Sequence, residues 1–352
     1  MNVLEVCQLQ THFFTRQGVV KAVDGVDFSL AEGQVLGLVG ESGSGKSVTG
    51  FSILGLVDPP GRVVGGQIRF RGQDLAGCTP AEMRAIRGNR IAMVFQDPLM
   101  TLNPVLRIDT QMVEAVQSHH RVSRRAALDR ACDVLTRVGI SSARERLSDY
   151  PHQFSGGMRQ RVAIAIALIN EPDLIIADEP TTALDVTIQS QILSEVQALT
   201  RDSGTALIWI THDLAVVAGI ADRIAVMYAG RIVETGPTGE VLSRPAHPYT
   251  VGLLGSIPGQ GRRGAALAQI PGMAPNMARL PPGCAFAPRC ARVGTGCDTD
   301  APATRDLGVG RAVRCHHPVA SAPQAPLNEG PSVVIAAPSG GVPAAVPSWS
   351  PP

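Results

Sequence analysis

Two glycine-rich segments of the sequence carry residue types that bind phosphate. The first segment consists of Gly40, Glu41, Ser42, Gly43, Ser44, Gly45, Lys46 and Ser47, and the second of Ser155, Gly156, Gly157, Met158, Arg159 and Gln160. One nucleotide does not need both segments from the same subunit. The pair therefore suggests a dimer in which ATP is held between the first segment of one subunit and the second segment of another.

The first segment has the sequence context of a phosphate-binding loop, because it follows an apolar run, 35–39, and precedes a helical stretch. Backbone N–H groups at the helix start would surround the β-phosphate. Lys46 would reach the β- and γ-phosphates, and the Ser47 hydroxyl would join the Mg²⁺ shell. Of 31 basic residues only Lys21 and Lys46 are lysine, which indicates that arginine would not serve at Lys46. The alternative is a flexible glycine turn without a ligand.

Two carboxylates follow another apolar run, 174–177, and would lie beside the phosphate loop. Asp178 is suited to hold Mg²⁺ through water, and Glu179 to polarise the water that attacks the γ-phosphate. Acidic residues at a strand end can also serve only as caps of the next helix. The phosphate-loop pattern favours the catalytic interpretation.

The second glycine-rich segment opens a helix that extends from Met158 to Ile169. A serine hydroxyl and glycine amides at a helix N-terminus form an anion site. Taken alone, the same pattern is also that of an ordinary helix cap.

Apolar runs of strand length alternate with helical stretches in the first 250 residues. The runs are 35–39, 91–95, 174–177, 206–210 and 224–228. They predict an α/β fold whose central strands are buried on both faces. The segment 26–30 instead alternates apolar and polar residues, which predicts an antiparallel layer ahead of the core. Helical spacing with exposed arginines, as in 124–138, predicts an inserted helical subdomain at about 100–170.

Composition limits the class of protein. The chain has 352 residues, is 44% hydrophobic and carries a net charge of +1, which is typical of a globular protein and gives no reason to expect nucleic-acid binding. The longest apolar stretch, 162–169, is far below the roughly 20 residues that cross a bilayer. The first residues show no basic leader with an apolar region, so we expect a reducing, cytoplasmic compartment.

The chain changes character after about residue 250. Four of the seven cysteines, Cys284, Cys290, Cys297 and Cys315, lie in a segment rich in glycine, proline and arginine. Four thiolates suggest tetrahedral sulfur ligation by zinc or an iron–sulfur cluster, and His316 or His317 could replace one of them. Structural thiols or a disulfide pair are the alternatives. We expect a cassette in 1–250, a cysteine-rich extension in 251–318 and a disordered tail in 319–352.

The order of the motifs points to a family. They occur as phosphate loop, Gln96 within Val94-Phe95-Gln96-Asp97-Pro98, the segment Ser155 to Gln160, Asp178-Glu179, Ala183-Leu184-Asp185, and Thr211-His212-Asp213. This order resembles the ABC-transporter ATPase cassette over residues 1 to about 245. Two later stretches, His247-Pro248-Tyr249-Thr250 and Leu280-Pro281-Pro282-Gly283-Cys284-Ala285-Phe286, are similar to the oligopeptide and dipeptide importers.

The resemblance implies roles for further residues. Gln96 would sense the γ-phosphate, join the Mg²⁺ shell and lie near the permease. His212 would hydrogen-bond the γ-phosphate, and Asp185 would contact the partner ATPase. An aromatic residue ahead of the phosphate loop would stack on adenine, for which Phe13 is the candidate by spacing and Phe14 the alternative. At the C-terminal cysteines the resemblance favours a four-iron four-sulfur cluster.

The resemblance also implies the biological context. The chain would be the ATPase of a peptide importer at the cytoplasmic face of the inner membrane, driven by ATP-dependent closure of two cassettes. Its partners would be a second ATPase subunit, a copy of itself or a sister, with two permeases and an extracytoplasmic peptide-binding protein. An importer of nickel or another small solute, and a soluble ABC ATPase outside transport, are the alternative functions.

Overall fold

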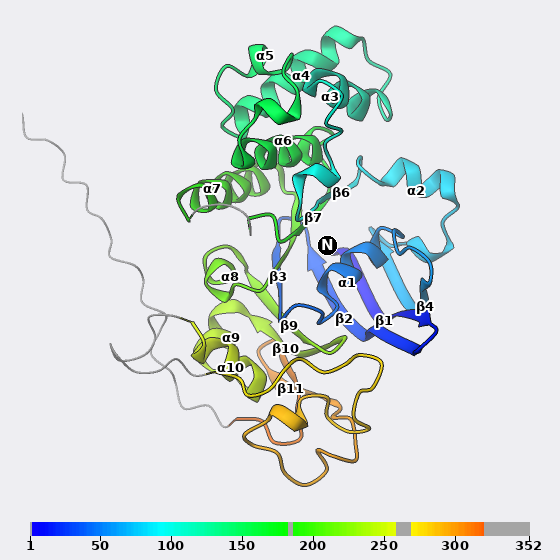
Figure 1. Cartoon of the computed structure of the whole chain (residues 1–352), viewed down its shortest axis with the longest axis vertical. Coiled ribbons are helices and arrows are strands. Elements are labelled where there is room, and N and C mark those ends of the chain that lie inside the picture. Colours follow the sequence, from blue (N-terminus) through cyan, green and yellow to red (C-terminus); the bar gives the residue numbers. More distant parts are fainter. Residues whose placement is uncertain (1, 182–185, 258–268, 320–352) are drawn as a thin grey trace, which may run out of the picture.

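The computed structural model describes residues 2–181, 186–257 and 269–319. Within them the chain forms two sheets and a group of helices set beyond one edge of the larger sheet (Figure 1). The predicted Asp185 contact and most of the predicted tail lie outside the described residues.

The smaller sheet is antiparallel and has the strand order β2-β1-β4-β5. Its strands are β1 (Asn2–Thr15), β2 (Gly18–Ala31), β4 (Gly61–Phe70) and β5 (Gln73–Asp74). Residues such as Leu4, Leu9 and Leu30 are fully buried, while intervening residues reach solvent. The antiparallel pairings of β1 with β2 and β4 confirm the predicted antiparallel layer.

The larger sheet has the strand order β11-β12-β10-β9-β3-β8-β7-β6. Its parallel strands are β3 (Val35–Val39), β6 (Ile91–Val94), β7 (Leu174–Asp178), β8 (Ala206–Thr211) and β9 (Arg223–Tyr228). Every residue of β3, β7 and β8 is buried, because helices and the smaller sheet cover both faces. The five predicted core strands are therefore confirmed, each to within one residue at either end.

Helices connect the strands of the larger sheet. They are α1 (Lys46–Ile53), α2 (Pro80–Ile86), α7 (Val186–Ser203), α8 (Leu214–Ile220), α9 (Thr238–Ser243) and α10 (Pro248–Gly255). Because α1 starts directly after the loop that leaves β3, its N-terminus lies at the carboxyl edge of the parallel strands. This edge is where open α/β sheets place their ligands.

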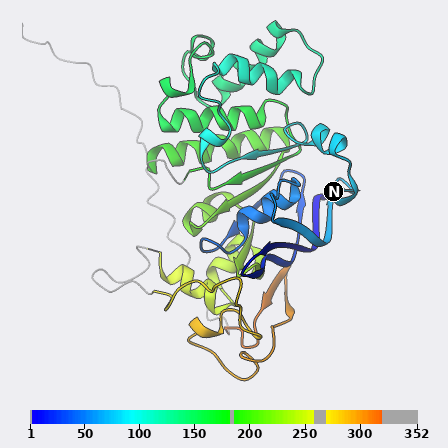
Figure 2. The same cartoon turned by 45° about the vertical axis from the view of Figure 1, so that its right-hand side comes forward.

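The predicted helical subdomain is present at the β6 end of the larger sheet. It contains α3 (Ile108–Gln117), α4 (Arg124–Arg137), α5 (Ala143–Arg146) and α6 (Gly156–Leu168). Figure 2 shows it above the larger sheet, with α6 packed directly against β6. An ion pair joins the two parts, because Arg161 on α6 lies 2.6 Å from Glu195 on α7. The subdomain is thus tied to the core through a nearly buried guanidinium.

The C-terminal extension is built into the cassette instead of standing apart from it. Strands β11 (Thr304–Gly308) and β12 (Arg311–Arg314) form a hairpin, and β12 pairs antiparallel with β10 (Arg231–Pro237). The hairpin thereby extends the core sheet (Figure 1). Sequence periodicity did not predict this pairing.

A buried carboxylate holds the start of α10 against the same strand. Glu234 on β10 accepts hydrogen bonds from the N–H groups of Ala246 and His247 at 2.7 and 2.8 Å. Burial lowers the pKa of His247 to about 4, so the ring is neutral at physiological pH and its Nδ1 accepts the N–H of Tyr249. These bonds fix the direction in which Tyr249 points.

Candidate nucleotide site

A cleft of about 730 Å³ lies at the carboxyl edge of the parallel strands. Its lining brings together Phe13, Val20, Ala22, Gly40, Glu41, Ser42, Gly43, Gly45, Lys46, Ser47, Val48, Gln96, Glu179, His212, Leu253 and Met277. Residues from β1, the predicted phosphate loop, and the ends of β6, β7 and β8 therefore meet in one place. The volume is large enough for a nucleotide.

The phosphate loop closes tightly around the ammonium of Lys46. Its Nζ donates to the carbonyl oxygens of Gly40 at 2.8 Å and Glu41 at 3.0 Å, and the side chain is only 5% exposed. Burial lowers the pKa of Lys46, whereas the carboxylates of Glu179, Asp178 and Glu41 raise it. At Gly45, with φ of 105°, a Cβ would lie 2.2 Å from the Ala22 carbonyl oxygen, so only glycine fits there.

Asp178 ends β7 directly beside the loop. Its Oδ1 accepts a hydrogen bond from the Ser47 hydroxyl at 2.9 Å. Burial raises the pKa of Asp178, and the Ser47 hydrogen bond opposes this shift. A hydroxyl and a carboxylate in contact at the bottom of a phosphate site are oxygen ligands of the kind that Mg²⁺ prefers.

Two further predicted residues contact the Glu179 carboxylate. Its Oε1 lies 3.2 Å from His212 Nδ1, and its Oε2 accepts from Gln96 Nε2 at 3.3 Å. The backbone of Glu179 has φ of 44°, a left-handed conformation that non-glycine residues seldom adopt. Such strain is frequent at functional sites, and here it accompanies a carboxylate turned into the cleft.

The two candidate aromatic residues differ in position. Phe13 lines the cleft, whereas Phe14 is 41% exposed and lies 4.5 Å below the Arg62 guanidinium. The structure therefore favours Phe13 for contact with a nucleotide base. Leu253 and Met277 also line the cleft, and sequence reasoning missed them because they lie beyond the six ordered motifs.

The second glycine-rich segment lies outside this cleft, at the start of α6 in the helical subdomain. The Ser155 hydroxyl accepts the N–H of Met158 at 3.3 Å and caps the helix. Ser155 and Gly156 are exposed and Gly157 is half-buried, but Gln160 is 2% exposed with its side chain inside the subdomain. The exposed residues remain candidates for a nucleotide bound by another subunit.

The C-terminal cysteines are free thiols in the structure. Burial raises the pKa of Cys315, and the neighbouring charges of Cys284, Cys290 and Cys297 raise it further. In the described part of the chain, however, no group of three or more His, Cys, Asp or Glu side chains is arranged to hold a metal ion. The prediction of iron–sulfur or zinc ligation thus has no support from this geometry.

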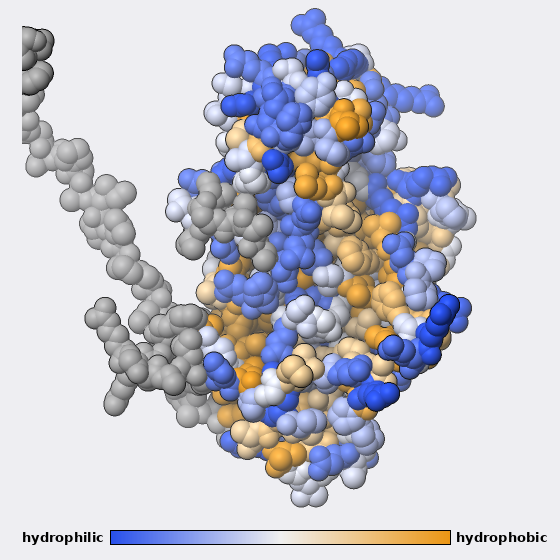
Figure 3. All heavy atoms as spheres, viewed as in Figure 1, coloured by the Kyte–Doolittle hydropathy of each residue, from blue (hydrophilic) through white to orange (hydrophobic). Residues whose placement is uncertain are grey.

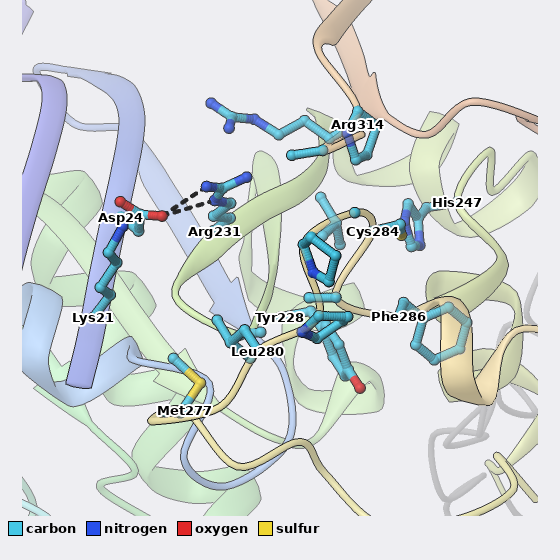
Figure 4. Close-up of a pocket in the computed structure, with 18 of the residues that line it drawn as sticks. Lys21, Asp24, Tyr228, Arg231, His247, Met277, Leu280, Cys284, Phe286 and Arg314 are labelled. Atoms are coloured by element: carbon cyan, nitrogen blue, oxygen red, sulfur yellow. Dashed lines mark hydrogen bonds and ion pairs between the residues drawn. The ribbon is translucent and has the colours of Figure 1, made fainter. Parts of the chain in front are cut away.

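A separate cavity of about 320 Å³ borders the cysteine-bearing segment. Figure 4 shows Cys284 beside it, together with Arg231, which is paired with Asp24, and Arg314. Its lining includes no residue of the phosphate loop, and it adjoins the nucleotide cleft at Met277, which lines both.

Comparisons with known proteins show which families this chain is similar to. The family described as "ABC transporter" matches residues 23–182, and "Oligopeptide/dipeptide transporter, C-terminal region" matches 233–297. A dimeric ATP-binding cassette solved in a post-hydrolysis state with ADP and phosphate has a TM-score of 0.61 and 26% identity, over 67% of this chain and 98% of that one.

Curated relatives are closer in sequence. The dipeptide transport ATP-binding protein DppD of Bacillus subtilis is 52% identical over 76% of this chain and 80% of its own length. The oligopeptide transport ATP-binding protein OppD of the same organism is 52% identical over 73% of this chain and 72% of its own length.

Fold and comparisons together define an ABC-type ATPase, and the phosphate loop, Glu179 and His212 line one cleft. More narrowly, the chain belongs to the family of ATP-binding subunits of dipeptide and oligopeptide ABC transporters. None of the helices described in the structure has both the length and the apolar character needed to cross a membrane.

Proposed function

We propose that this chain hydrolyses ATP to power a peptide importer in the inner membrane, which it joins at the cytoplasmic face. The observation that carries the proposal is the contact of Gln96 and His212 with the Glu179 carboxylate inside a cleft walled by the phosphate loop. The family membership supplies peptides as the substrate class.

In the proposed reaction the phosphate loop orients the triphosphate and Glu179 orients water. The N–H groups at the start of α1 and the Lys46 ammonium bind the β- and γ-phosphates. Glu179 accepts a hydrogen bond from the attacking water, and His212 and Gln96 fix the carboxylate. Mg²⁺ would be held by the Ser47 hydroxyl, the Gln96 side-chain oxygen and, through water, Asp178, and it would neutralise phosphate charge.

We infer that two cassettes close on ATP. The exposed Ser155 and Gly156 of one subunit would contact the nucleotide in the other, with Gly157 beside them, and Asp185 would contact the partner ATPase. The separation of the second segment from the cleft within one chain supports this arrangement. The second cassette is a sister subunit or another copy of this chain.

A set of exposed apolar side chains follows Gln96 and supports a permease contact. Met100 is 73% and Val105 is 75% exposed, and Leu99 is also exposed. Figure 3 shows apolar groups in the lower part of the helical subdomain, whose surface is otherwise largely hydrophilic. Exposed apolar groups that cluster in this way mark protein contact sites.

We expect Met100→Asp to reduce recovery of the chain with its permeases by about tenfold, because a charge would enter an apolar contact. Recovery from membranes after co-expression with the permeases, sister ATPase and binding protein of the same genome measures this. Val309→Asp, at an 82% exposed position on the C-terminal hairpin, is the matched control.

Labelled peptide uptake by the reconstituted assembly tests the substrate class, and ATP-dependent uptake of nickel but not of peptide would contradict it.

The iron–sulfur cluster that the resemblance implies stays a prediction. It rests on the resemblance and on the four cysteines that the segment contains, not on their arrangement in the described residues. Anaerobically purified protein is expected to carry about four irons per chain with visible absorption, and Cys290→Ser to lose both. Cys7→Ser, on β1, should retain them. Wild-type protein without iron would refute the iron–sulfur prediction, and zinc in its place would favour the alternative ligation.

A further inference from the structure

A side chain from the cysteine-bearing segment holds the phosphate loop. Arg289, directly before Cys290, is 248 residues distant in sequence from Glu41. Its Nη1 donates to Glu41 Oε2 at 2.7 Å and its Nη2 to Oε1 at 3.0 Å. The Arg289 side chain is 7% exposed and that of Glu41 27%. Two parallel bonds of this kind fix direction as well as distance.

The backbone of Glu41 is also engaged. Its N–H donates to Tyr249 Oη at 2.8 Å, and its carbonyl oxygen accepts from Lys46 Nζ at 3.0 Å. Every polar group of Glu41 therefore has a partner within the protein, two of them outside the loop. Glu41 shapes the phosphate loop in this structure instead of presenting its own N–H to a phosphate.

The groups that hold Glu41 are themselves rigid. Arg289 Nε donates to the Pro271 carbonyl oxygen at 2.9 Å. The rings of Tyr228, Tyr249 and Phe286 pack together, with centroid separations of 4.6 to 5.4 Å. Figure 4 shows Tyr228 and Phe286 side by side in this cluster. Such packing preorganises the guanidinium, so the ion pair loses little side-chain entropy when it forms.

The charge of Glu41 acts on the nucleotide site. Its carboxylate is one of three that influence the Lys46 ammonium, together with Glu179 and Asp178. A triphosphate would bring several more negative charges to the same loop. In a partly buried site like charges repel strongly, so a Glu41 carboxylate without its guanidinium would oppose ATP binding.

We propose that Arg289 is a positioning residue for ATP binding, which neutralises and orients Glu41 so that nucleotide affinity depends on the C-terminal cysteine-bearing segment. The proposal rests on the proposed ATP-binding function and gives the His247-Pro248-Tyr249 and Arg289-Cys290 stretches a role in it. Arg289 itself lies outside every nucleotide motif of the sequence.

The test compares MgATP affinities of the full chain by titration calorimetry. Arg289→Gln is expected to raise the Kd by about tenfold or more, because it leaves Glu41 uncompensated. Glu41→Gln alone removes the repelling charge together with the ion pair, so it should raise the Kd for MgATP much less than Arg289→Gln does. The double variant Glu41→Gln/Arg289→Gln should return to within about threefold of wild type, since the offending charge is gone. If Arg289 served only to stabilise the fold, the double variant would bind MgATP as weakly as Arg289→Gln.

Arg305→Gln, an exposed arginine on β11, is the matched control and should bind like wild type. Wild-type affinity in Arg289→Gln, or a double variant that stays as weak as Arg289→Gln, would overturn the inference. A tenfold loss of MgATP affinity in Glu41→Gln would also overturn the inference. This variant still tests the inference if Arg289→Gln does not fold. Failure of the wild-type chain itself to bind MgATP would instead refute the proposed function.

Discussion

Replacing Glu179 by glutamine is expected to lower ATP turnover by about 100-fold to 10,000-fold while leaving ATP affinity close to wild type. The amide has the same shape and can keep the contacts with Gln96 and His212, which lie 3.3 and 3.2 Å from the carboxylate oxygens. It cannot take a proton from the attacking water. The variant should therefore bind ATP, close with a competent partner cassette and remain closed.

Phosphate release by the assembled complex measures turnover, and size-exclusion chromatography with ATP detects the closed dimer. Glu171→Gln is the matched control. The Glu171 side chain, unlike that of Glu179, is largely exposed and forms only a long ion pair with Arg130, so this variant should turn over ATP like wild type. Unchanged turnover in Glu179→Gln would remove Glu179 from its assigned role.

The second large effect is expected at Lys46, even for a change that keeps the positive charge. The Lys46 Nζ fits between two loop carbonyl oxygens at 2.8 and 3.0 Å in a nearly solvent-free position. A planar guanidinium is larger and cannot occupy the same space as a compact ammonium. We expect Lys46→Arg to weaken ATP binding by roughly 30-fold to 1000-fold, the equivalent of two charge-assisted hydrogen bonds.

Equilibrium titration with a fluorescent ATP analogue measures this loss. The only other lysine of the chain, Lys21, provides the matched control, because it is exposed on β2 and lies outside the nucleotide cleft. Lys21→Arg should bind the analogue like wild type. Equal affinity in Lys46→Arg would show that charge alone suffices at this position.

Sequence analysis predicted those parts of the site that are marked by short, contiguous residue patterns. The core strands are apolar runs, and each nucleotide motif combines a strand end with a loop or a helix start, so spacing alone placed Lys46, Asp178 and Glu179 at one edge. Spacing also made Phe13 the candidate ahead of Phe14, and of the two only Phe13 lines the cleft; its contact with adenine stays a prediction.

Contacts between residues that are far apart in the sequence are not marked by any short sequence pattern. Arg289 and Glu41 are each ordinary in their local context, and only the folded chain brings them together. The same holds for Leu253 and Met277 in the cleft and for the pairing of β12 with β10. Burial of Gln160 was missed for another reason, because helical spacing does not tell which motif residue faces inward.

The pairing of β12 with β10 has a practical consequence for anyone who shortens this protein. Cutting the chain after α10 would uncover one side of β10, with its unbonded amide and carbonyl groups, and would leave the Glu234 carboxylate without Arg311. Bare strand edges recruit other strands and promote aggregation. The cysteine-bearing region therefore cannot be removed without exposing the edge of β10. A shortened ATPase would need a redesigned β10 edge to avoid aggregation.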